Sequence, residues 1–138
     1  MITYRKQVSP DSTTPANTSG YVIYQLDLNT AGGGARMADV EIIASLSTSP
    51  FTPLNISTIY YRKLQIINDL VVPNYSGYPD GNSSFTFVTP TTPTSLYLSE
   101  ISYRQNDPNR NRIQIKTTNP TGANQAGTCF VHFKINFY

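Results

Sequence analysis

The fold is decided by the stretch "TCFVHFKINFY" (residues 128–138), in which apolar side chains recur at every second position. Successive side chains of an extended chain point to opposite faces, so this spacing places the apolar groups together on one side. The apolar face carries Val131, Phe133, Ile135 and Phe137, and the polar face carries His132, Lys134 and Asn136. The pattern predicts a β-strand with one buried and one exposed face.

This strand also carries the only cysteine of the chain, Cys129, and its only histidine, His132. The two residues are three positions apart, so on a strand they point to opposite faces and cannot form a thiol–imidazole pair. We therefore expect Cys129 to be a small buried residue and His132 to be exposed or part of an interface. The stretch argues against an enzyme, and we expect no catalytic residue, no cofactor and no metal.

The same two-residue period recurs through the chain, with clear examples at residues 21–28, 39–46, 85–88 and 112–117. Residues 57–72 read as one long strand or as two strands with a bend, and residues 95–104 as a further strand. Residues 35–46 also fit a helical stripe, so a helix remains an alternative there.

Proline, glycine and asparagine separate these segments, notably in "PDGN" (residues 79–82), "TPTTPT" (residues 89–94) and "NPTGANQAG" (residues 119–127). Regularly spaced short strands of this kind are typical of sandwiches and barrels. The sequence predicts an all-β fold: an antiparallel β-sandwich, jelly-roll-like, with about eight strands. We expect an N-terminal arm or first strand followed by a Pro/Ser/Thr-rich linker over residues 1–20, and the sandwich domain over residues 21–138.

Composition limits the classes of function. The chain has 138 residues, of which 13% are charged, and a formal net charge of +2. Its basic residues are scattered rather than gathered in a stripe, which argues against nucleic-acid binding. A single cysteine excludes an internal disulfide, and no apolar run is long enough for a signal peptide or a membrane span. We expect a protein made in a cytoplasm and not inserted in a membrane.

One loop has the composition of a recognition surface. The segment "VVPNYSGYPDGN" (residues 71–82) offers aromatic rings beside short polar groups, at Asn74, Tyr75, Tyr78, Asp80 and Asn82. Rings stack on sugar faces while amides and carboxylates bond hydroxyls, and the same groups also suit a protein contact. A sugar-binding loop, a protein-binding loop and an ordinary exposed loop all remain open.

The segment "ITYRKQV" (residues 2–8) is a candidate assembly arm. It is extended and precedes a Pro/Ser/Thr-rich stretch, so it could dock on a neighbouring subunit by adding a strand to its sheet. The residues that would make this contact are Ile2, Tyr4, Arg5 and Lys6.

The Thr/Asn/Ser-rich loops "TPTTPTS" and "NPTGANQAG" and the closing strand "FVHFKINFY" give a chain that resembles small structural proteins of bacteriophage virions. The resemblance is to decoration proteins, spikes and fibre tips. It implies a capsid-decorating or projecting β module in the virion, a homo-oligomer (trimer or pentamer) in contact with other virion proteins. It also implies, as the alternative, an attachment module that binds a carbohydrate or a receptor on the host surface.

Overall fold

The computed structural model describes residues 2–28, 37–47, 56–65, 82–86, 95–104 and 112–138. Residues 37, 56–65, 82–86 and 104 are described by their backbone alone. The strands are β1 (Ile2–Val8), β2 (Thr18–Asp27), β3 (Met37–Ser47), β4 (Ile56–Gln65), β5 (Asn82–Thr86), β6 (Tyr97–Arg104), β7 (Arg112–Asn119) and β8 (Thr128–Phe137).

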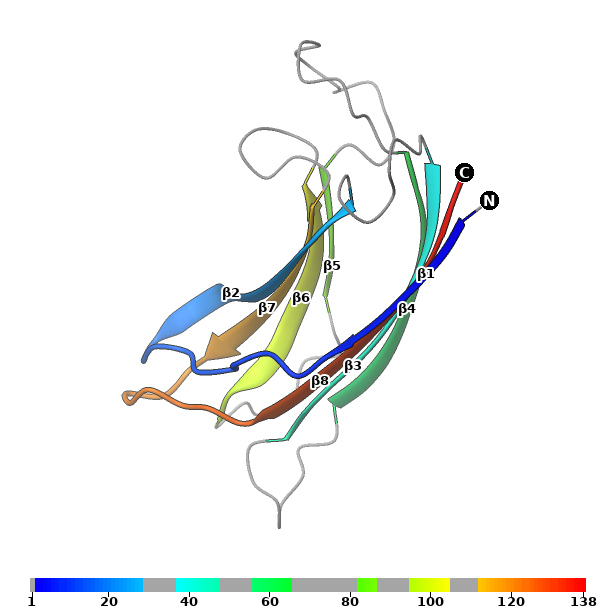
Figure 1. The fold of residues 1–138 in the computed structure, drawn as a ribbon. Helices are drawn as coiled ribbons and strands as arrows, with labels where there is room; N and C mark the ends of the chain where they lie inside the picture. Colours follow the sequence, from blue (N-terminus) through cyan, green and yellow to red (C-terminus); the bar gives the residue numbers. More distant parts are fainter. Residues whose placement is uncertain (1, 29–36, 48–55, 66–81, 87–94, 105–111) are drawn as a thin grey trace.

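These strands form two antiparallel sheets that face each other (Figure 1). The β8 sheet has the order β1-β8-β3-β4, and the β7 sheet has the order β2-β7-β6-β5. The sheets approach at the end where the chain passes from β1 to β2 and from β7 to β8, and they diverge toward the end that holds both termini. The prediction of an all-β, antiparallel fold is confirmed, and the two facing sheets agree with a sandwich.

The alternation of β8 produces the burial that the sequence predicts. Its inward side chains are Cys129, Val131, Phe133, Ile135 and Phe137, each at most 2% exposed. Fully burying one such large apolar side chain contributes about 1.5–3 kcal/mol, so β8 supplies much of the core. Tyr24 of β2 packs on Phe133 with ring centroids 5.8 Å apart and joins the two sheets.

Residues 37–47 form β3, so the helical alternative over residues 35–46 is wrong. The segment forms a strand because β3 pairs with β8 on one side and β4 on the other. Its two-residue period then buries Val40, Ile42 and Ala44 completely on the inner face. A helix would have turned these side chains to different sides.

The Pro/Ser/Thr-rich segment between β1 and β2 is bonded to the rest of the domain. Ser12 and Thr14 are 1% and 0% exposed. The Ser12 hydroxyl donates to the carbonyl of Gly127 (2.6 Å) and accepts from its N–H (2.8 Å), and Thr14 forms a two-way backbone bridge with Gln125. These bonds tie the segment to the β7–β8 loop, and β2 already begins at Thr18.

β1 is the first strand of the β8 sheet. It pairs along its whole length with β8 of the same chain, from Ile2 opposite Phe137 to Val8 opposite Val131. Of the two alternatives for the N-terminal segment, the structure therefore has the first strand and not an arm that leaves its own domain. β4 covers residues 57–65 of the ambiguous segment 57–72, and the remainder of that segment lies outside the described residues.

Candidate functional site

The outer face of the β8 sheet carries the candidate site. β8 lies between β1 and β3, and its register brings polar residues of all three strands into rows. Arg5, Lys134 and Glu41 form one row, and Gln7, His132 and Ile43 form the next. The side chains reach this face because the alternate positions of each strand fill the core.

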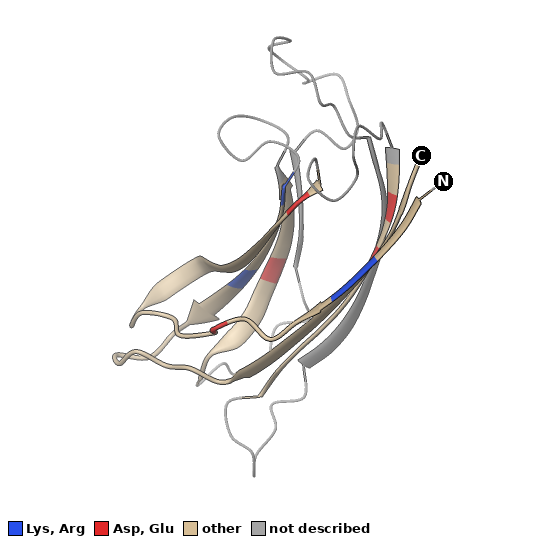
Figure 2. Ribbon diagram, viewed as in Figure 1, with Lys and Arg blue, Asp and Glu red and all other residues tan. Residues whose placement is uncertain are grey.

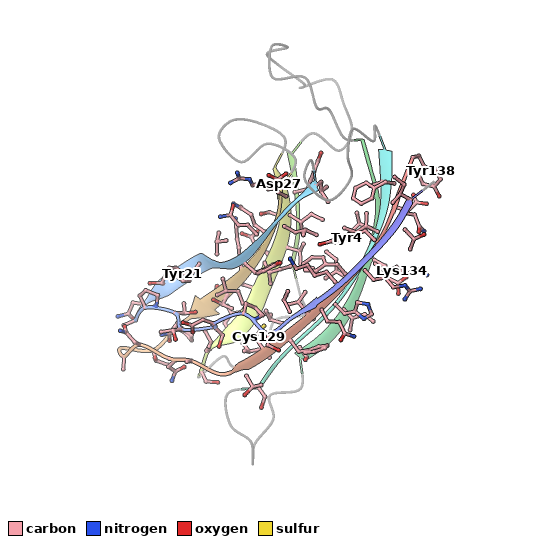
Figure 3. The ribbon with its side chains drawn as sticks, in the orientation of Figure 1. Tyr4, Tyr21, Asp27, Cys129, Lys134 and Tyr138 are labelled. Atoms are coloured by element: carbon pink, nitrogen blue, oxygen red, sulfur yellow. The ribbon has the colours of Figure 1, made fainter. Side chains whose placement is uncertain are left out.

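Five of these residues line a shallow hollow of about 140 Å³, the β8 hollow: Arg5, Glu41, Ile43, His132 and Lys134. It contains a guanidinium, an ammonium, an imidazole, one carboxylate and one aliphatic side chain. In Figure 3 the Lys134 side chain points away from the other sheet, and Figure 2 shows the basic segment of β1 in blue.

The rest of this face is polar in its middle and aromatic at its two ends. Thr3 donates to the Oδ1 of Asn136 (3.0 Å), and the Tyr138 hydroxyl donates to the Oδ2 of Asp39 (3.1 Å). Phe130 is 42% exposed at one end of β8, and Tyr138 is 54% exposed just beyond the other.

Cys129 belongs to the opposite, inner face. It is 2% exposed, and burial raises the pKa of its thiol from 9.0 to about 11. A nucleophilic cysteine needs a depressed pKa and a base within about 3 Å. His132 projects from the other side of β8, so the two side chains lie on opposite faces of the strand, as its two-residue period predicts.

The residues proposed for the assembly arm divide between the two faces of β1. Ile2 is 61% exposed, and Tyr4 packs edge-on against Phe137 with ring centroids 6.5 Å apart. A hydrogen bond to Tyr24 raises the pKa of Lys6, which lies at the edge of the sandwich. Arg5 alone points into the β8 hollow. The sequence could not reveal this division, because it depends on the register with β8.

The proposed recognition loop falls almost wholly outside the described residues. Asn74, Tyr75, Tyr78 and Asp80 are not described. Asn82 is the first residue of β5, where its backbone is paired with that of Arg104. Its role in a ligand site stays a prediction.

The outer face of the β7 sheet holds a second cluster of polar side chains. These side chains bond to one another and are largely shielded from solvent. Lys116 and Glu100 form an ion pair at 3.0 Å, with side chains only 11% and 25% exposed. Gln114 accepts from Ser102 (3.3 Å) and donates to Gln25 (3.1 Å). The alternation of residues 112–117 predicts exposed polar side chains here, but β7 is a central strand and its neighbours cover them.

Sequence reasoning missed Glu41, Ile43 and Lys134 as members of a common site. The available signal was the outward side of the β8 alternation, which includes His132 and Lys134. Glu41 and Ile43 join them only through the pairing of β3 with β8. In the described parts of the chain, no group of three or more His, Cys, Asp or Glu residues could hold a metal ion.

No helix within the described ranges is long and apolar enough to cross a membrane. No family model matches the chain, and no curated protein or solved structure is significantly similar to it.

Proposed function

We propose that this protein is a non-enzymatic structural module that associates with further copies of itself and decorates or projects from a phage particle. The observation that carries the proposal is the position of its exposed apolar side chains. Among the described residues, three of the four large apolar side chains that are exposed, Ile2, Phe130 and Tyr138, lie on or next to the paired strands β1 and β8. They lie at the two ends of the β1–β8 pair, and exposed apolar side chains on one sheet favour a protein interface there.

The chemistry of the chain supports a binding role. Its single thiol is buried and has a raised pKa, so it is poorly suited to act as a nucleophile. Aromatic side chains are enriched at protein interfaces, and Phe130 and Tyr138 offer exposed rings at the two ends of β8, outside the β8 hollow.

Light scattering after gel filtration tests the self-association. The expected mass is that of a trimer or a pentamer, and a monomer at every accessible protein concentration would contradict it. Phe130→Ser should weaken the oligomer. Tyr21→Ser is the matched control, because Tyr21 is comparably exposed (40%) but belongs to β2 of the other sheet.

Location on a phage particle needs a separate test. Phage particles purified from the source culture should contain the chain at a fixed ratio to the major capsid protein, as measured by mass spectrometry. Loss of the chain through a density gradient, with the capsid protein retained, would contradict the virion role and leave self-association untouched.

A jelly-roll-like, eight-stranded sandwich is the finer proposal for the fold. The pairing of β1 with β8 and of β2 with β7 supports it, because a jelly roll is a long antiparallel hairpin wound on itself. The hairpins β3–β4 and β5–β6 depart from that scheme, which would pair β3 with β6 and β4 with β5.

Host attachment through residues 71–82 is the alternative function. The described residues include only Asn82 of that loop. The alternative therefore rests on the sequence alone.

A further inference from the structure

We propose that the β8 hollow binds a sugar acid, a monosaccharide unit that carries one carboxylate. This site goes beyond the proposed structural role and does not depend on it, since its residues would bind the ligand in a monomer as well as in an oligomer. It is also separate from the predicted loop at residues 71–82.

The first argument is that the ionisable side chains lining the β8 hollow have no bonding partner in the described part of the chain. Among the charged side chains that the structure describes, seven interact with another side chain: Lys6, Asp11, Asp27, Asp39, Glu100, Arg112 and Lys116. No hydrogen bond or ion pair engages the side chains of Arg5, Glu41, His132 or Lys134 within the described ranges. These four line one hollow.

The second argument is the arrangement of the positive groups. Arg5 and Lys134 are direct cross-strand partners, and like charges at such positions destabilise a sheet. Glu41 adjoins Lys134 on its other side and offsets one of the two charges. A bound carboxylate would offset the second charge, and a guanidinium binds a carboxylate through two parallel hydrogen bonds.

The third argument selects a sugar acid over other anions. The Glu41 carboxylate repels a dianion such as phosphate, but it accepts hydrogen bonds from hydroxyl groups. Ile43 offers an aliphatic surface for the C–H face of a ring, and His132 adds a further polar contact. One negative charge, several hydroxyls and one apolar face describe a sugar acid.

The size of the hollow sets the expected affinity. A volume of about 140 Å³ is below the roughly 300–1,000 Å³ of pockets that enclose drug-sized ligands. The site therefore accommodates a single ring on an open surface. Binding of one unit should be in the millimolar range, and repeated units on several subunits would strengthen it by avidity.

The single histidine makes the test direct. The imidazole signals of His132 are unambiguous in a two-dimensional NMR spectrum of the full chain, and the probe is sodium glucuronate at constant ionic strength. Glucuronate should shift these signals saturably at millimolar concentrations. Glucose, which lacks the carboxylate, and acetate, which lacks the ring, should each shift them less than glucuronate does.

Variants then assign the contacts. Arg5→Gln and Lys134→Gln should each weaken glucuronate binding by about tenfold, the loss expected for one charge-assisted hydrogen bond. Lys6→Gln is the matched control. It also removes one positive charge, but Lys6 projects from the other face of β1, away from the hollow. It should leave the affinity unchanged, and unchanged thermal midpoints would show that all three variants fold.

Three results would overturn the proposal. The first is the absence of a saturable glucuronate shift. The second is an equal response to acetate or to inorganic phosphate, which would reduce the site to non-selective anion binding. The third is an equal loss of affinity in Lys6→Gln, which would show that only the overall charge of the protein matters.

Discussion

Cys129 and His132 lie three residues apart on β8 and face opposite sides of the sheet. Cys129 is 2% exposed in the core, whereas His132 lines the β8 hollow on the outer face. The intervening Phe130 and Val131 continue the alternation without a bulge, and the pairing with β3 runs unbroken from Cys129 to Phe137. The only thiol and the only imidazole of the chain therefore act in separate environments.

The buried thiol predicts slow alkylation. Near neutral pH, iodoacetamide should leave Cys129 unmodified in the folded protein, because the thiolate is the reactive form and burial raises its pKa to about 11. Mass spectrometry should show modification only after unfolding in urea. Rapid modification of the folded protein would contradict the assigned burial.

The same pKa predicts a loss of stability at high pH. The unfolded chain releases the thiol proton near its ordinary pKa of 9.0, before the folded chain does so at about 11. The contribution of this group to the free energy of unfolding is therefore complete below pH 9 and is lost between pH 9 and pH 11. Chemical denaturation of the wild type and of Cys129→Ala across this range isolates the effect, since the variant should lack that part of the decline.

Gly127 is required by a close backbone approach. A Cβ atom at this position would lie 2.3 Å from the carbonyl oxygen of Ser47. Gly127→Ala should lower the free energy of unfolding by about 2 kcal/mol or more, because backbone atoms must move to accept it. Gly122→Ala is the control in the same loop, since a Cβ atom there meets nothing within 4 Å. Equal stability of the two variants in urea denaturation would contradict this contact.

Asn119 holds the end of the molecule where the sheets approach. Its side-chain N–H groups donate to the carbonyls of Thr14 (3.0 Å), Pro15 (3.2 Å) and Ala123 (2.8 Å). Asn119→Ala should cost about 3 kcal/mol, because the carbonyls of Thr14, Pro15 and Ala123 each lose one donor. The exposed Asn124 accepts one bond from the Ala16 N–H, so Asn124→Ala should cost no more than about 1 kcal/mol. Thermal and urea denaturation measure both values.

β1 should be necessary for stability. Deletion of residues 1–8 removes the Tyr4 contact with Phe137 and exposes the backbone of β8 as a new sheet edge. We expect a lower thermal midpoint and aggregation that increases with protein concentration. Tyr4→Ala should reproduce part of the loss, whereas Ile2→Ala should not, since Ile2 is 61% exposed. A truncated chain as stable as the full one would show that β1 only docks on the surface.

The sequence by itself determined the strands and their buried faces. In β8 and β2 the apolar residues recur at every second position, and this local period fixes which side chains enter a core whatever the neighbouring strand is. Residues 35–46 also fit a helix, and the neighbours β8 and β4 decided for the strand β3. The isolation of Cys129 from His132 followed from the same period. Gly127 and Asn119 indicated a loop at residues 119–127 in the sequence. The contacts that these two residues make could not be predicted from it.

Only the tertiary structure decided which strands are neighbours and which polar residues share a surface. Arg5, Glu41 and Lys134 come from strands far apart in the chain, and they meet because β8 pairs with β1 on one side and with β3 on the other. Pairing between distant strands depends on the whole core and on the chain connections, which no local pattern encodes. For the same reason, residues 2–8 read as a possible arm in the sequence but form an integral strand in the folded protein.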